Sequence, residues 1–576
     1  MVYLPRTQRA PAILFALVGQ LASWGRAPAA QLPDSQHILR SARAAQADFE
    51  SIRRHNLPTA FGHGGGPCDE RIGRFCFWFG DDDTLSPPPE PARIAQARDR
   101  LIHRLDSAAV LLPGDEWIAG QRVRYLIESS RDVDALGAAR ACRAVEWWCR
   151  ALVGLVLHRE GEFAAADSAY QETLRDMPSV ERCRWRDIGV LLEGELRRRY
   201  ERLGCEARES LEDRVWRLAQ PLYSRPGNDR RTEHFARVTM TRIAEHAASV
   251  YGVPWGDDLR EITLRYGWPP YWTREQPGPS GSWDVIVTGH DPPRAAHLLP
   301  GAAALEEPGD AKAGDWMPDA PRPRELYAPP YAASLAALAH QVARFRRGDS
   351  CLVVAAYDVS RDTLFGGGSL DAALVLRRDE HGEPVIERRP DSPASDQIVA
   401  KAACAPLLLS LEIVSPSRRH AARARYGMHP PAAPGDALAL SDVLLFDPPD
   451  SLPTQLAAAL PYVRGSTVVD SRSRLGLFWE TAGLDSGEAV TTVVSVLPVG
   501  TGWLRKAAES LRLAGRRASV RLEWREIPEH HGSVAGRALA LDLRGLSPGQ
   551  YRIEIVVQGP GGRRGRAQRE ITVRER

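Results

Sequence analysis

The spacing of apolar residues divides the chain into a helical front part and a strand-rich back part. From Pro91 to about Gly204, apolar residues recur every three or four positions and proline is rare, which predicts amphipathic helices. From Cys351 onward, short apolar runs are bounded by turn residues, which predicts strands, and a short helix is expected at 334–346 just before them. The pattern therefore predicts a multidomain α + β protein, in which an α-helical array precedes two immunoglobulin-like β-sandwich domains.

One helical unit, from Trp147 to Pro178, has the residue order of a tetratricopeptide repeat. In this order small residues let two paired helices approach closely, and large residues fill the gap between them. The positions concerned are Gly154, Leu157, Gly161, Ala166 and Tyr170. Gly120, 34 positions before Gly154, marks a second and degenerate copy. The region at 91–210 thus resembles a short tetratricopeptide array, and the alternative is an ordinary helical bundle.

A Trp-rich segment at 211–274 carries spaced aromatic, charged and turn-forming residues, including the runs 254–258 and 265–269. In these runs it resembles the GWxTD domain family, which is found in exported bacterial proteins and has no assigned molecular activity. Pro254 stands for the glycine of the naming motif and Asp257 for its threonine, so the resemblance is to a divergent member. The matching positions are Trp216, Pro221, Asn228, Glu233, Arg237, Trp255, Asp258, Tyr266, Gly267 and Pro269.

Changes in composition give the other domain boundaries. The stretch from Arg274 to Pro330 is crowded with proline, glycine and aspartate, so a linker with little core of its own is expected there. The predicted order is a signal peptide at 1–29, a Cys- and Gly-containing segment at 30–90, tetratricopeptide-like repeats at 91–210, the GWxTD-like segment at 211–274, a linker at 275–335, and sandwiches at 336–448 and 465–576.

The first thirty residues have the layout of a secretory signal peptide. Two arginines precede an apolar stretch at 12–24, and small residues follow at 27–30. The apolar stretch falls short of the roughly 20 residues needed to span a bilayer, so cleavage is expected to leave a protein that is not inserted in the membrane. The mature chain is therefore expected outside the cytoplasm, in the periplasm, the envelope or the medium.

The chain has eight cysteines, an even number that favours disulfides in an oxidising compartment. We expect one bridge between Cys68 and Cys76 in a glycine-rich loop. A second is expected between Cys351 and Cys404, across the first sandwich. The pairing among the four other cysteines is left open by the sequence; they are Cys142, Cys149, Cys183 and Cys205.

The formal net charge of +2 argues against a nucleic-acid-binding surface. No pattern of a catalytic triad, a zinc site or a cofactor-binding loop is present, so the sequence predicts no catalytic residue, no metal and no cofactor.

The sequence therefore favours a protein-binding scaffold over an enzyme. Repeat arrays bind protein or peptide partners on their concave side, which the first helix of each pair lines. The polar candidates on those helices are Arg122, Arg124, Arg150, His158 and Arg159. The alternative is an envelope enzyme of hydrolase type, with a site assembled around 255–258.

Overall fold

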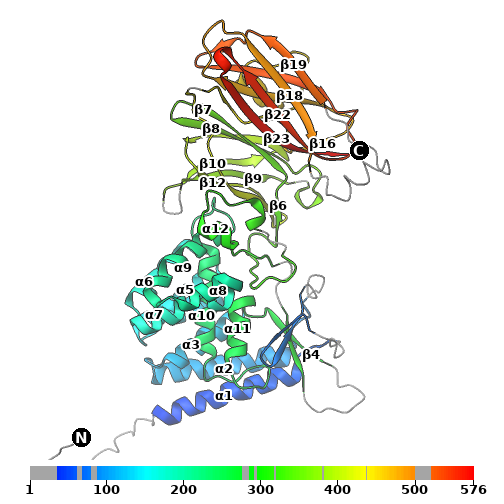
Figure 1. The fold of residues 1–576 in the computed structure, drawn as a ribbon. Helices are drawn as coiled ribbons and strands as arrows, with labels where there is room; N and C mark the ends of the chain where they lie inside the picture. The colour runs from blue at the N-terminus through cyan, green and yellow to red at the C-terminus, as the bar shows by residue number, and fades with distance from the viewer. Residues whose placement is uncertain are drawn as a thin grey trace, which may run out of the picture.

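In the computed structural model, the helices gather at one end of the molecule and the two β-sandwiches follow towards the other end (Figure 1). The predicted signal peptide at 1–29 lies outside the described residues. The structure describes residues 35–60, 68–79, 87–275, 285–290, 295–316, 320–366, 368–378, 382–435, 437–499 and 520–575.

The helical domain covers the predicted helical region and extends beyond it on both sides. It starts earlier than predicted, with the long helix α1, and Asp115 caps α3 by accepting a hydrogen bond from the Ile118 N–H at 2.8 Å. Its helices are α1 (Ser35–Asn56), α2 (Ala92–Leu111), α3 (Glu116–Glu128), α4 (Asp132–Arg140), α5 (Glu146–Arg159), α6 (Phe163–Asp176), α7 (Ser179–Arg186), α8 (Gly194–Arg202), α9 (Cys205–Ala219), α10 (Asp229–Ala244) and α11 (Asp257–Tyr266).

Helices α5 and α6 form a closely packed hairpin. A Cβ atom added at Gly154 would lie 2.9 Å from Cζ of Tyr170, so only glycine permits this approach. Gly161 makes the turn between the helices with φ of +81°. Gly154, Ala166 and Tyr170 are all buried, as the small–large alternation predicts.

Helix α10 lies at the centre of the helical domain. It buries 13 of its 16 residues, including charged ones, and packs against α3, α5, α6, α9 and α11. The helix has an apolar stripe at Ala236, Met240, Ile243 and Ala244, and its charged residues are buried as well, so its neighbours must supply partners for those charges.

The region at 275–335 is not the linker with little core that the composition predicts. It contains β5 (Val287–His290) and α12 (Ala302–Glu306), and β5 pairs with β4 (Tyr271–Glu275) in a sheet that also includes β1 (Thr59–Ala60). Its buried apolar side chains lie mostly on irregular backbone, one or two at a time. They therefore show no helical or strand periodicity from which burial could be predicted. The buried ones include Leu298, Leu299, Leu305, Trp316 and Tyr327.

The first sandwich consists of two sheets that share one apolar core. The sheet order is β10-β9-β12-β13-β6 in one and β11-β8-β7 in the other. The strands are β6 (Ser334–Ala337), β7 (His340–Arg347), β8 (Ser350–Asp358), β9 (Leu370–Arg377), β10 (Val385–Ser392), β11 (Ser395–Ala403), β12 (Leu407–Ser415) and β13 (His420–Met428).

The helix predicted at 334–346 is wrong, because this stretch forms β6 and β7. Its alanines and leucines favour a helix locally, but β7 pairs antiparallel with β8 across a tight turn at Gly348, where φ is +64°. Tertiary pairing therefore overrides the local propensity.

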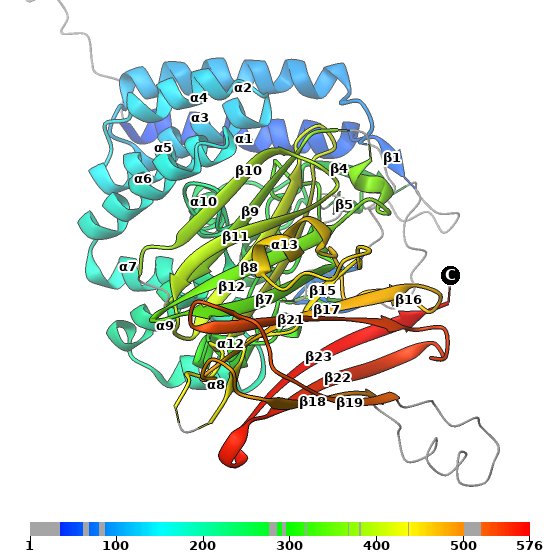
Figure 2. The same cartoon turned by 90° about the horizontal axis from the view of Figure 1, so that it is seen from above.

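The second sandwich begins earlier than the predicted residue 465. The strands at 439–446, which the sequence analysis placed in the first sandwich, pair with β17 of the second. Its sheets have the orders β14-β17-β21-β20, with β15 also on β17, and β16-β23-β22-β18-β19. Strands β23, β22, β18 and β19 of the second sheet can be followed in Figure 2. The strands are β14 (Ala439–Leu440), β15 (Leu444–Phe446), β16 (Val468–Asp470), β17 (Arg474–Ala482), β18 (Val490–Pro498), β19 (Val520–Glu526), β20 (His530–His531), β21 (Val534–Asp542), β22 (Gly549–Gln558) and β23 (Arg564–Arg574).

All eight cysteines form disulfides, as expected for an oxidising compartment. The pairs Cys68–Cys76 and Cys351–Cys404 are those that the sequence analysis gave. The four cysteines left open pair locally, as Cys142–Cys149 and Cys183–Cys205.

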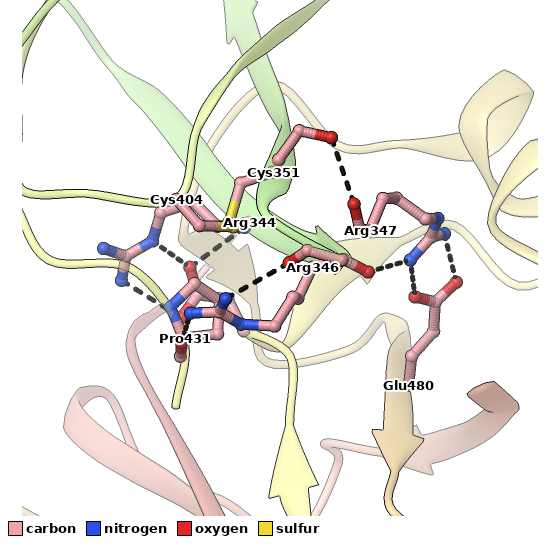
Figure 3. The surroundings of a disulfide bond; sticks show 10 residues. Arg344, Arg346, Arg347, Cys351, Cys404, Pro431 and Glu480 are labelled. Atoms are coloured by element: carbon pink, nitrogen blue, oxygen red, sulfur yellow. Dashed lines mark hydrogen bonds and ion pairs between the residues drawn. A yellow bond between two sulfur atoms is a disulfide. The ribbon is translucent and has the colours of Figure 1, made fainter. Parts of the chain in front are cut away.

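The junction of the two sandwiches lies close to the Cys351–Cys404 disulfide (Figure 3). Arg347, the last residue of β7, donates two hydrogen bonds to Glu480 of β17, at 2.5 and 2.8 Å. Apolar residues of β7, β8, β15 and β17 form a shared core between the sandwiches. The sandwiches are therefore packed together and not merely tethered.

The Gly154–Tyr170 contact predicts a position-specific effect of added side-chain volume. Gly154→Val should overpack this contact and destabilise the helical domain by about 1–3 kcal/mol. Gly137 on α4 is the matched control, because an added Cβ atom there meets no atom within 4 Å. Thermal unfolding should show a lowered midpoint for Gly154→Val alone, and equal midpoints for the two variants would contradict the prediction.

The loop lengths of the disulfides predict how much each bridge contributes to the free energy of unfolding. Cys351–Cys404 spans 53 positions and Cys68–Cys76 spans eight. Chain entropy then assigns about 4 kcal/mol to the first bridge and about 2.5 kcal/mol to the second. Replacing both cysteines of the longer loop by alanine should reduce the hydrogen-exchange protection of β8 and β12 accordingly. Unchanged protection in these strands would contradict the contribution assigned to the Cys351–Cys404 bridge.

Candidate functional site

A cavity of about 780 Å³ opens where the helical domain meets the turn after α11. We name it the central cavity. Helices α1, α2, α3, α5 and α10 contribute to its wall, together with residues 266–272 and 326–330. Its volume lies within the roughly 300–1,000 Å³ range of ligand sites in proteins.

Aromatic and proline side chains form much of this wall. Gly267 allows the turn that carries them, because its φ is +94° and an added Cβ atom would lie 3.2 Å from Nη2 of Arg237. The aromatic and proline residues in the wall are Pro58, Pro87, Pro88, Pro91, Tyr266, Trp268, Pro269, Pro270, Tyr271, Trp272, Tyr327 and Pro330.

Glu233 and Arg237 of α10 meet His158 of α5 at the cavity. Nε of Arg237 donates to Glu233 at 2.5 Å, and Nε2 of His158 lies 2.7 Å from the other carboxylate oxygen. Burial would raise the pKa of Glu233, but the Arg237 guanidinium and the His158 contact outweigh it and hold the pKa below its ordinary value. Glu233 is therefore ionised, and its carboxylate holds the side chains of Arg237 and His158 in place.

Thr232, His158 and Glu233 are placed like the three members of a hydrolase triad. The Thr232 hydroxyl lies 2.9 Å from Nδ1 of His158, opposite the nitrogen that faces Glu233. A nucleophile must reach its substrate, however, and Thr232 has no exposed surface. The hydroxyl also donates to the carbonyl oxygen of Asp229 at 3.1 Å. These contacts join α5 to α10 and leave no accessible nucleophile.

A second buried charge network lies deeper, between α1 and α3. Arg124 donates to Glu128 at 2.8 Å and to Glu50 at 2.9 Å, and Arg53 also pairs with Glu128. Burial opposes the ionisation of Glu128, but Arg53 and Arg124 outweigh it and lower its pKa to about 2. Arg124 is 2% exposed, so it does not face a partner as the sequence analysis expected. Its charge is used to join the two helices.

The remaining predicted binding residues differ in position. Arg159, at the end of α5, is exposed at the cavity wall and has no ion pair with any residue that the structure describes. Arg122 pairs with Asp106 at 2.5 Å, and Arg150 pairs with Glu146 and Asp176. Neither Arg122 nor Arg150 lines the cavity, so the five candidates do not form one surface.

The segment at 255–258, the alternative enzyme site, has a structural use. Asp258 accepts hydrogen bonds from Nε and Nη2 of Arg74 at 2.6 and 2.7 Å, and these bonds lower its pKa to about 2. An added Cβ atom at Gly73, the neighbouring turn residue, would lie 2.6 Å from Cβ of Asp258. The carboxylate therefore holds a hairpin and is not free to act as an acid or base.

That hairpin consists of β2 (Glu70–Ile72) and β3 (Phe75–Phe77), and the Cys68–Cys76 disulfide closes it. Glu70 accepts two hydrogen bonds from Arg265, at 2.7 and 2.6 Å. Phe77 stacks on Tyr266 with ring centroids 3.8 Å apart. The hairpin thus packs against α11 and holds the end of this helix in place. The chain enters the cavity wall from that end.

The other GWxTD-like positions support the elements around the cavity. Asn228 caps α10 by accepting from the Arg231 N–H at 3.0 Å, and its amide donates to the Trp216 carbonyl oxygen at 2.7 Å. Pro221 offers its carbonyl oxygen to Arg423 of the first sandwich at 2.7 Å. Trp255 lines a small apolar pocket next to Trp268.

Sequence reasoning missed Asp229, the first residue of α10. It is 3% exposed, and the Tyr331 hydroxyl donates to it at 2.9 Å. Burial raises its pKa to about 6. No local signal in the sequence marks Asp229, because its burial depends on contact with Tyr331 from a distant segment.

Among the residues that the structure describes, no group of three or more His, Cys, Asp or Glu side chains is placed to hold a metal ion. No described helix is long and apolar enough to cross a membrane.

No protein-family model and no curated protein matches this chain. A solved structure reported as "structural insight into host cell surface retention of a 1.5-MDa bacterial ice-binding adhesin" is 10% identical, with 42% of this chain and 67% of that chain covered and a TM-score of 0.14. Red sea bream transglutaminase is 9% identical, with 41% and 31% covered and a TM-score of 0.13. The FN1–FN3 domains of chicken CNTN1 are 12% identical, with 42% and 70% covered and a TM-score of 0.14. At these TM-scores the likenesses carry no argument about function.

The raised pKa of Asp229 predicts a pH-dependent contribution to stability. Between about pH 4 and pH 6 the folded protein binds a proton that the unfolded chain releases. This stabilisation is complete below about pH 4 and is lost as the pH rises through 6. Asp229→Asn lacks the titrating group, so it should gain stability relative to the parent protein, by about 2.5 kcal/mol between pH 4 and pH 7. Urea unfolding across this range measures the difference, and parallel stability curves would contradict it.

Proposed function

We propose that this chain is an exported, extracytoplasmic protein that binds a segment of a partner protein in the central cavity. The observation that carries the proposal is the composition of the cavity wall: aromatic and proline surface, with the exposed Arg159 at its edge. Such surface suits a polypeptide segment, because aromatic side chains provide large contact area at low cost in conformational entropy.

The state of the cavity's charged groups favours binding over catalysis. General acids and bases need a pKa near the working pH and access to the substrate. Glu128, Glu233 and Arg237 are instead engaged with other groups of the protein. Asp229 has the suitable pKa, but it does not line the cavity. No observation on the described residues favours the enzyme alternative over binding.

Four disulfides and the predicted signal peptide support a place outside the cytoplasm, where such bridges persist. Membership of the GWxTD family is part of the proposal, and so is the tetratricopeptide-like origin of the α5–α6 hairpin. The GWxTD-like positions support the family proposal by clustering around one cavity, since Tyr266, Gly267 and Pro269 line it beside Glu233 and Arg237.

Site-specific cross-linking in the producing cell tests the proposal. A photoreactive amino acid in place of Arg159 should give a covalent adduct with a defined partner polypeptide, because this side chain lies at the cavity and is exposed. The matched control replaces Arg140, an exposed arginine at the end of α4 that does not line the cavity. Position 140 should give no such adduct.

The same experiment separates the two functions. An enzyme with a small-molecule substrate would give no polypeptide adduct at position 159. Absence of an adduct there, or equal adducts at 159 and 140, would refute binding of a partner segment in the central cavity.

A further inference from the structure

A second cavity, of about 700 Å³, lies between the helical domain and strand β9 of the first sandwich. We name it the interdomain cavity. Six arginines line it, against three acidic residues, Asp167, Glu209 and Asp213. The arginines are Arg175, Arg182, Arg186, Arg217, Arg231 and Arg377. The wall therefore carries an excess of positive charge.

Half of these arginines are neutralised by carboxylates. The ion pairs are Arg231 with Asp167 at 2.9 Å, Arg186 with Glu212 at 2.7 Å and with Asp213 at 2.9 Å, and Arg175 with Asp176 at 3.1 Å. These pairs engage Asp167 and Asp213, two of the three acidic residues in the wall. The other three arginines do not pair with either carboxylate.

Arg182, Arg217 and Arg377 have no ion pair with any carboxylate in the part of the chain that the structure describes. Arg182 donates only one long bond, of 3.5 Å, to the carbonyl oxygen of Leu174. The Nε atoms of Arg217 and Arg377 are buried and have no hydrogen-bond partner among the described residues. A buried donor without an acceptor is costly, and here no carboxylate compensates the guanidinium charge of either side chain.

Like charges also crowd behind the cavity. Burial lowers the pKa of Arg377, and the neighbouring Arg425 and Arg217 lower it further. Tyr223 and Glu412 oppose this effect, and Glu412 also pairs with Arg425 at 3.6 Å. Arg217 and Arg377 remain without a carboxylate partner among the described residues, so an additional anion is favoured beside them.

We propose that the interdomain cavity binds a multivalent oxyanion, which carries either phosphate groups or several carboxylates, through Arg182, Arg217 and Arg377. The planar guanidinium group matches both kinds of oxyanion with paired hydrogen bonds. Because these side chains come from α7, α9 and β9, a bound anion joins the helical domain to the first sandwich. This site is separate from the central cavity and does not depend on its function.

Isothermal titration calorimetry on the full mature protein tests the site at low ionic strength, with pyrophosphate and citrate as probes. We expect one site per chain for at least one probe. Binding of pyrophosphate alone identifies a phosphate site, binding of citrate alone identifies a carboxylate site, and binding of both identifies recognition by charge. The double variant Arg217→Gln/Arg377→Gln should weaken this binding at least tenfold, whereas Arg104→Gln/Arg140→Gln, on exposed helix faces, should leave it unchanged.

Folding of the double variant is checked by its melting temperature, which should not fall, because the substitutions remove like charges that lack a counter-charge. If it does fall, Arg182→Gln alone serves as the test variant and should also weaken binding. Failure of both probes to bind the parent protein would overturn the proposal. Binding that is equally tight in the folded Arg217→Gln/Arg377→Gln or Arg182→Gln variant would overturn it as well.

Discussion

Helix α10 buries charged side chains, and the partners of those charges determine how the surrounding chain is arranged. An unpaired charge in a protein interior costs several kcal/mol. Arg230 pairs with Glu325 at 2.8 Å, with both side chains fully buried. Arg237 donates to the carbonyl oxygens of residues 264, 265 and 326 at 2.6–3.1 Å. These partners lie on α11 and on the segment that follows it. Both elements must therefore pack against α10 to supply partners for its buried charges.

The same constraint fixes the first sandwich to the helical domain. The end of a helix leaves carbonyl oxygens without intrahelical donors. At the end of α9, Arg425 donates to the carbonyl oxygens of Leu218 and Gln220 at 3.0 and 2.8 Å, and Arg423 donates to that of Pro221 at 2.7 Å. Both arginines are buried on β13. Removal of the sandwich would expose the helix end and two arginines together, so the sandwich is an integral part of the fold and not a spacer.

Features set by neighbours in the sequence were mostly predicted, and features set by distant partners mostly were not. The exceptions are the Cys351–Cys404 bridge, which was predicted across 53 positions, and the local Cys142–Cys149 pair, which was left open. The Gly154–Tyr170 hairpin and the Cys68–Cys76 loop depend on residues fewer than twenty positions apart. By contrast, β7 looks helical until β8 pairs with it, and Glu325 is an ordinary surface residue until Arg230 is known to face it. The candidate site divides in the same way. Glu233 and Arg237 were singled out as positions of the GWxTD resemblance, but nothing near His158 in the sequence indicates that α10 would lie against it.

The pairing of charges also determines what each cavity can do. In the central cavity, the protein supplies counter-charges to Glu128, Glu233 and Arg237, so shape and apolar contact are left to select a partner. In the interdomain cavity, Arg217 and Arg377 have no counter-charge among the described residues. Selection of a ligand there therefore depends on its charge. Electrostatic attraction weakens with salt, whereas apolar burial does not. Raised salt should therefore weaken anion binding between the domains more than recognition at the central cavity, where only Arg159 at the edge is unpaired among the described residues.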